Sequence, residues 1–175
     1  PRLLQPFVST KMIPIRGMVH EVRQCFKRTI EPFTEEDSTF TPKPSLRTVA
    51  NEVAHVAQIV DWFVEGAIGT GFHYDYVKMD QAAREVTSLA TAKTLLDEAF
   101  DRAIERLSAT PIKQLMERLP EGGMLSNEPK ISVIGGIIEH TAHHRGRLAV
   151  YAQMLDKKPG FPYKYHHTLD IRHPD

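Results

Sequence analysis

The chain has 175 residues, a length that suits one domain of ordinary size and lets it bury a substantial core. Its 22 basic and 22 acidic side chains give a formal net charge of zero, so electrostatics favours neither nucleic acid nor a membrane surface as a partner. Cys25 is the only cysteine, which excludes an intrachain disulfide, and no stretch approaches the roughly 18 apolar residues of a membrane span. Because the first residues also lack the apolar run of a signal peptide, we expect a cytoplasmic protein.

Four segments between the prolines carry apolar side chains at steps of three and four residues, which is the spacing of an amphipathic helix. We predict helices over residues 12–30, 45–66, 80–107 and 132–155. Ser45 is the expected N-cap of the second helix, and Gly66 and Gly69 are expected to end it. Pro159, directly after two lysines, prevents continuation of the fourth helix.

No segment alternates apolar and polar residues with a period of two, so the fold class we predict is all-α, a four-helix bundle formed by a single domain over residues 1–175. The connections at 31–44 and 109–130 are long, so we do not expect a plain up-and-down topology. A short extra helix is predicted around Pro111 to Arg118. Residues 160–175 form a polar C-terminal tail.

The histidines of the fourth predicted helix are its most informative feature. Successive residues of an α-helix turn by about 100°, which places His144 inside the apolar stripe of Ile137 and Leu148 and places His140 on the flank of that stripe. His143 points toward the edge instead. Because imidazoles four residues apart lie one turn apart on the same face, His140 and His144 could bind one metal ion. The alternative is a pair of core histidines with ordinary hydrogen-bond partners.

A third ligand should come from another helix. His55 in the second predicted helix lies on the same apolar flank as Ile59 and Trp62, although a packing or surface role is an open alternative. A metalloprotease of the zincin type would need a glutamate directly after the first histidine of the pair. Thr141 occupies that position and Glu139 points to the opposite face, so we discount this class.

The HxxxHRG pattern of the fourth predicted helix resembles the last-helix signature of the DinB-like proteins, the DNA-damage-inducible and YfiT-like bundles. The pattern is formed here by His140, His144, Arg145 and Gly146. The stretch SLRTVANEVAHVAQIVDWF resembles the second helix of that family, and YAQMLDKKPGFPY is similar to its closing segment. The resemblance covers about residues 45–163. Arg147 departs from the family pattern, which often has glutamine at this position.

This resemblance implies a four-helix bundle, commonly a homodimer, in which three histidines bind nickel or zinc. Carried over to this sequence, the metal ligands are His55, His140 and His144. Some relatives use the metal to activate a low-molecular-weight thiol, as in thiol S-transferases and a mycothiol-dependent isomerase. Many others have no known activity, so the resemblance implies a metal site more directly than it implies a reaction.

Two classes of function follow from such a site. Three neutral ligands leave a zinc or nickel ion an open position, at which thiol transfer or hydrolysis is chemically accessible. The first hypothesis is therefore a metal-dependent transferase that joins a small thiol to a small-molecule substrate, with a metal-dependent hydrolase as a variant. Arg145, at the edge of the buried face, could hold a substrate carboxylate or could pair with a neighbouring helix. Asn51 and Asp61 could orient a ligand imidazole.

The second hypothesis is a non-catalytic metal-binding protein, associated with stress or with protein interaction. In this hypothesis the ion mainly ties the second helix to the fourth. It is motivated by the lack of a clear general acid or base beside the three histidines.

Overall fold

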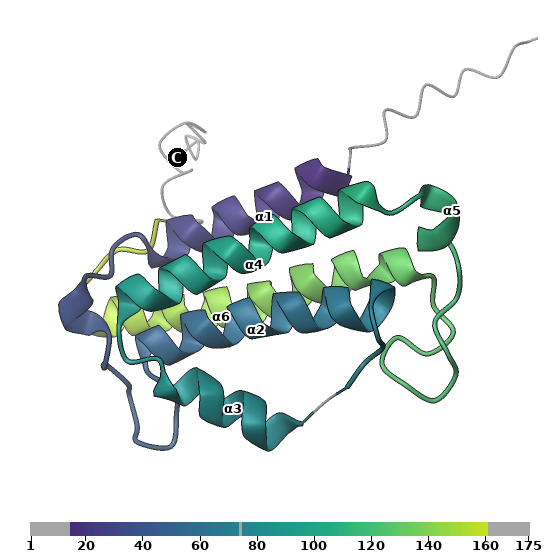
Figure 1. The fold of residues 1–175 in the computed structure, drawn as a ribbon. Helices are drawn as coiled ribbons and strands as arrows, with labels where there is room; N and C mark the ends of the chain where they lie inside the picture. Colours follow the sequence, from purple (N-terminus) through teal and green to yellow (C-terminus); the bar gives the residue numbers. More distant parts are fainter. Residues whose placement is uncertain (1–14, 74, 161–175) are drawn as a thin grey trace, which may run out of the picture.

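The computed structural model describes residues 15–73 and 75–160, and no strand occurs among them. Four long helices form the body of the molecule (Figure 1): α1 (Ile15–Ile30), α2 (Val49–Ile68), α4 (Leu89–Ala109) and α6 (Val133–Met154). Shorter elements connect them: α3 (Tyr76–Glu85), α5 (Ile112–Leu115), and 3-10 turns at Glu35–Asp37 and Lys130–Ser132. The predicted all-α four-helix bundle is confirmed. The short helix expected after Pro111 is α5.

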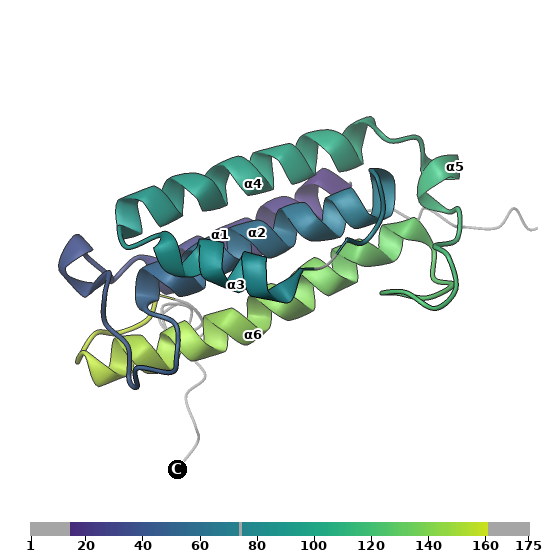
Figure 2. The same ribbon diagram turned by 60° about the horizontal axis from the view of Figure 1, so that its bottom comes forward.

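Each long helix packs against two others. Both α1 and α2 contact α4 and α6, so α1 and α2 occupy opposite corners of the bundle. Ion pairs join Asp61 to Arg102 and Glu65 to Arg106, at 2.7 and 2.8 Å, so residue numbers rise together along α2 and α4. These two helices are therefore parallel. The chain reverses between them through α3, which packs on α2 (Figures 1 and 2). The topology is thus not a plain up-and-down one, and α3 is the reason.

The single helix predicted over residues 80–107 is wrong, because α3 and α4 are separated at residues 86–88. The amide of Asn51 in α2 donates to three carbonyls at the end of α3, those of Ala83, Arg84 and Val86. The hydroxyl of Ser88 then accepts a hydrogen bond from the backbone N–H of Thr91 and caps α4. Side chains thus provide hydrogen-bond partners for backbone groups at the end of α3 and at the start of α4, so few backbone hydrogen bonds are lost at the break.

The other helix ends differ less from the predictions. The N-cap of α2 is Thr48 rather than Ser45. The Thr48 hydroxyl accepts a hydrogen bond from the backbone N–H of Asn51, and the Asn51 side-chain oxygen accepts one from the backbone N–H of Thr48. Gly66 lies inside α2, which ends at Ile68 with Gly69 as its C-cap. The fourth helix matches its predicted bounds to within one residue at each end. Residues 12–14 and 161–175 lie outside the described residues.

The core is one continuous cluster to which all four long helices contribute. Of the four long helices, α2 is the most deeply buried, because most of its residues are buried. That burial matters for the site, since Glu52 and His55 lie within this helix and are buried with it. Among the described residues, no helix is long and apolar enough to cross a membrane.

Candidate metal centre

Three histidines predicted as metal ligands meet between α2 and α6. His55, His140 and His144 each present a ring nitrogen within 4.8 Å of the others. The ring centroids are 5.2 Å apart for His55 and His140, 4.9 Å for His55 and His144, and 4.5 Å for His140 and His144. The structure therefore brings together all three side chains, which come from segments about 85 residues apart in the sequence.

The antiparallel register of α2 and α6 places these side chains opposite one another. The Tyr151 hydroxyl near the end of α6 donates to the Arg47 carbonyl just before α2, at 3.2 Å. One to two turns further along α2, Glu52 faces His144. Residues further along α2 meet residues earlier in α6, so His55 falls between His140 and His144. Helix geometry and the register of α2 against α6 together bring the three histidines into one cluster.

Burial keeps the three imidazoles neutral. His55 and His144 are 6% and 3% exposed, and His140 is half-buried. Loss of solvent lowers the pKa of His55 to about 3 and that of His140 to about 3. Burial also lowers the pKa of His144, although a neighbouring carboxylate opposes it. All three therefore carry a free nitrogen lone pair at neutral pH, which is the form that binds a metal ion.

Two of these side chains have buried ring nitrogens without hydrogen-bond partners. The Nδ1 atoms of His55 and His140 are shielded from solvent and form no hydrogen bond with any described residue. Leaving such an atom unsatisfied costs about 1–3 kcal/mol, so ordinary core histidines would be expected to have partners. Of the pair His140 and His144, only His144 has the hydrogen-bond partner that the alternative of core histidines requires, which favours the metal-site hypothesis. The residues present fit a transition-metal ion, because nitrogen donors converge and no carboxylate in the described cluster competes as a ligand.

Glu52 belongs to the candidate site, although it is not among the residues predicted from the sequence. Its side chain is 0% exposed, and its carboxylate bonds Nδ1 of His144 at 2.5 Å and the guanidinium of Arg147 at 2.7 Å. Burial alone would raise the pKa of Glu52, but the hydrogen bonds from His144 and Arg147 hold it below its usual range. Since Nδ1 of His144 is engaged, only its Nε2 is available to an ion. A carboxylate that orients a ligand imidazole in this way strengthens metal binding.

The signal for Glu52 was present in the sequence. A lone glutamate interrupts the apolar run NEVAHVAQIV three residues before His55, where a buried charge requires a partner. That partner is in part Arg147, the position at which the chain departs from the glutamine common in similar proteins. The arginine at position 147 is thus paired with the carboxylate of Glu52 on the facing helix.

Other residues considered from the sequence lie elsewhere. Asn51 binds the end of α3, and Asp61 pairs with Arg102, so neither orients a ligand imidazole. The ring of exposed His143 contacts the Arg147 guanidinium at 3.2 Å and does not belong to the cluster of three. Gly146 is exposed, and a Cβ added there would meet no other described segment within 4 Å, so no described helix packs closely on it.

Arg145 is half-buried on α6 and acts electrostatically on Cys25 of α1, where its charge opposes the rise in the pKa of the thiol that burial causes. This places Arg145 toward α1, whereas the three histidines lie between α6 and α2. Its role in substrate binding stays a prediction.

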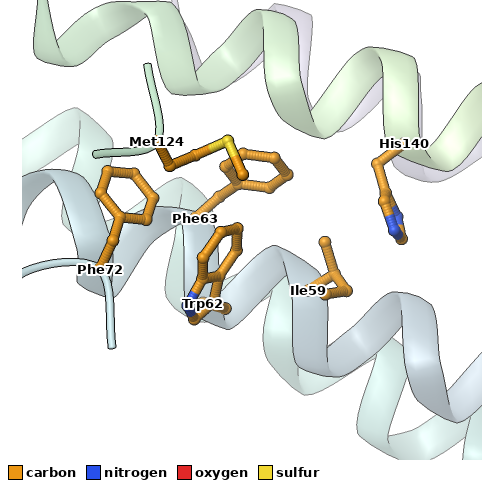
Figure 3. Close-up of a pocket in the computed structure, with 6 residues that line it drawn as sticks. All are labelled: Ile59, Trp62, Phe63, Phe72, Met124 and His140. Carbon is orange, nitrogen blue, oxygen red and sulfur yellow. The ribbon is translucent and has the colours of Figure 1, made fainter. Parts of the chain in front are cut away.

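A pocket of about 390 Å³ adjoins the cluster on one side. Figure 3 shows His140 at one end of this pocket, with its ring directed toward α2. The remaining lining is Ile59, Trp62, Phe63, Phe72 and Met124. Phe72 lies in the loop after α2, and the ring of the next residue, His73, hydrogen-bonds the Thr70 carbonyl.

A helical bundle whose facing antiparallel helices bring together three histidines, two buried and one half-buried, defines a class of metal-site scaffold. The family model of the DinB superfamily matches residues 18–148, which include all three histidines, Glu52 and Arg147. The chain belongs to the DinB superfamily. A comparison with curated proteins gives no match.

Proposed function

We propose that this protein binds one divalent transition-metal ion, zinc or nickel, through His55, His140 and His144. The observation that carries the proposal is the convergence of three neutral imidazoles between α2 and α6, two of which have a ring nitrogen with no hydrogen-bond partner among the described residues. The DinB family membership supports the same assignment. A homodimer, implied by the resemblance of the sequence to this family, is part of the proposal.

The reaction class that we propose is transfer of a low-molecular-weight thiol to a small electrophilic substrate. A zinc or nickel ion with an open coordination position would supply a Lewis acid that lowers the pKa of a thiol or water presented to it. Glu52 holds the His144 ring so that its Nε2 faces the cluster. The apolar side chains beside His140 limit the access of water to the same point.

The lining of the pocket favours thiol transfer over hydrolysis. Apart from His140, the described side chains around the pocket are apolar and include no acid or base that could protonate a leaving group. Hydrolysis commonly requires such a group, whereas a thiol that has lost its proton is already a strong nucleophile. A non-catalytic role, in which the ion only ties α2 to α6, is the alternative. It is favoured by the same lack of an acid or base.

Elemental analysis of the purified protein tests the metal assignment. We expect about one zinc or nickel ion per chain in the wild type, and its loss in His55→Ala, His140→Ala and His144→Ala. His143→Ala is the matched control, because His143 is adjacent to His144 but exposed. Unchanged metal content in all three ligand variants would overturn the assignment.

Conjugation assays with several small thiols and an aromatic electrophile then test the reaction. Turnover by the zinc- or nickel-loaded wild type that disappears in His144→Ala would support a transferase. Metal binding without turnover across several thiols would instead favour the non-catalytic alternative.

A further inference from the structure

The pocket beside His140 is a continuation of the metal cluster along the groove between α2 and α6. His55, Ile59 and Phe63 follow one another at four-residue steps, so they lie along one face of α2. On α6, Gly136 lies one turn before His140 and faces Phe63. The pocket therefore begins where the histidines end, and a molecule bound in it would reach the open side of His140 (Figure 3).

Gly136 of α6 and Gly66 of α2 leave space for two aromatic rings of the pocket wall, those of Phe63 and Phe72. A Cβ on Gly136 would lie 2.6 Å from the Phe63 ring, and a Cβ on Gly66 would collide with the Phe72 ring. The rings thus lie directly on helix backbone. Trp62 and Phe72 meet edge to face at 5.0 Å, and the Trp62 indole N–H donates to the His73 carbonyl at 2.8 Å. The wall is therefore held in place before any ligand binds.

The lining carries no charge. Five of its six side chains are apolar, and the sixth is the imidazole of His140, so the lining contains no carboxylate, lysine or arginine. A charged ligand group would lose its hydration here without gaining an ion pair from the lining. A flat, neutral ring would instead bury apolar surface against aromatic edges and faces. The volume of about 390 Å³ is ample, because an apolar cavity of about 150 Å³ already holds benzene.

We propose that this pocket binds a neutral aromatic group of the small-molecule substrate, with the atom that reacts directed toward His140 and the ion site. The binding of the ring depends only on the pocket, whereas the placement of the reacting atom rests on the proposed metal site. The two parts can therefore fail separately.

Calorimetry on metal-free protein tests the pocket alone. We expect 2-naphthol to bind saturably, and 2-naphthoate and a naphthyltrimethylammonium ion to bind at least 10-fold more weakly, since a charge is desolvated without compensation. Met124→Asp should weaken 2-naphthol binding at least 10-fold. Met116→Asp should leave it unchanged, because Met116 is similarly exposed but does not line the pocket. Absence of saturable binding, or equal binding of the charged probes, would overturn the proposal.

Zinc-loaded protein tests whether the ring lies next to the ion. Acetohydroxamate and 2-naphthohydroxamate carry the same metal-binding group, but only the second has an aromatic ring. We expect the second to bind about 100-fold more tightly, as burial of a two-ring group predicts, and Met124→Asp to reduce this ratio. Equal affinities would overturn the adjacency while leaving the metal site intact. If neither hydroxamate binds but 2-naphthol does, the metal assignment fails and the pocket stands.

Discussion

Glu52 of α2 and His144 of α6 lie 92 positions apart in the sequence and form a buried carboxylate–imidazole pair, with Oε2 2.5 Å from Nδ1. The second carboxylate oxygen is held by Arg147, one turn further along α6. This arrangement fixes the orientation of the His144 ring, one of the proposed ligands, through the Nδ1 atom. It also explains why a fully buried carboxylate is tolerated in the apolar centre of α2, since both of its oxygens have partners.

Replacement of Glu52 by Gln should weaken metal binding without removing it. The amide keeps the shape of the side chain but loses the charge that polarises His144, and loss of such a partner typically reduces metal affinity by about 10- to 100-fold. Competition with a chromogenic chelator would measure the dissociation constant. Glu139→Gln is the matched control, because Glu139 is an exposed glutamate of α6, the helix that carries His144. An unchanged affinity in Glu52→Gln would show that the carboxylate serves only the packing of α2 against α6.

Removal of the metal should lower the melting temperature of the wild type. An ion that binds only the folded state stabilises it by about 2.7 kcal/mol when its free concentration is 100 times the dissociation constant. Scanning calorimetry with and without a chelator would measure the shift. In His140→Ala the chelator should have almost no effect, because one of the three ligands is absent. A wild type whose melting temperature does not respond to chelation would contradict a role for the ion in joining α2 to α6.

The metal-free protein should lose stability as the pH falls from about 6.5. The pKa of His55 and of His140 is about 3 in the folded chain and 6.5 without burial, so the unfolded chain binds more protons between these values. Their contribution is fully present above pH 6.5 and declines as the pH falls toward 3. Each imidazole contributes a slope of up to about 1 kcal/mol per pH unit.

Urea unfolding at pH 7.5, 6.0 and 5.0 would measure this decline before most carboxylates titrate. A variant with both His55→Ala and His140→Ala should show a flatter dependence over the same range. Equal stability of the metal-free wild type at pH 7.5 and 5.0 would contradict the burial of neutral imidazoles.

The fourth helix and its histidines could be predicted from the sequence because the signal is local. Apolar spacing fixes which face of α6 is buried, and this placed His140 and His144 inward and His143 outward. The break before α4 could not be found in this way. It depends on Asn51, a residue of a different helix that binds the end of α3. Apolar periodicity alone carries no information about such a contact.

The pairing of Glu52 with His144 was equally out of reach, because it depends on the register between α2 and α6. Each helix on its own indicates only that a polar side chain is buried. His55 could be predicted only in part. Its position on an apolar face of α2 follows from the sequence, but its convergence with His140 and His144 depends on how α6 packs against α2.

Two adjacent glycines of α6 allow a closely matched test of the pocket wall. Gly136→Ala should destabilise the protein by about 1–3 kcal/mol, because its methyl group would enter the space held by the Phe63 ring. Gly135→Ala should instead be neutral or stabilise by up to about 1 kcal/mol, since Gly135 is exposed and alanine favours the helix. Urea unfolding of both variants would measure the difference. If the two substitutions have the same effect, Phe63 does not lie on the α6 backbone. If Gly136→Ala also leaves 2-naphthol binding unchanged, this ring is not the wall of the pocket.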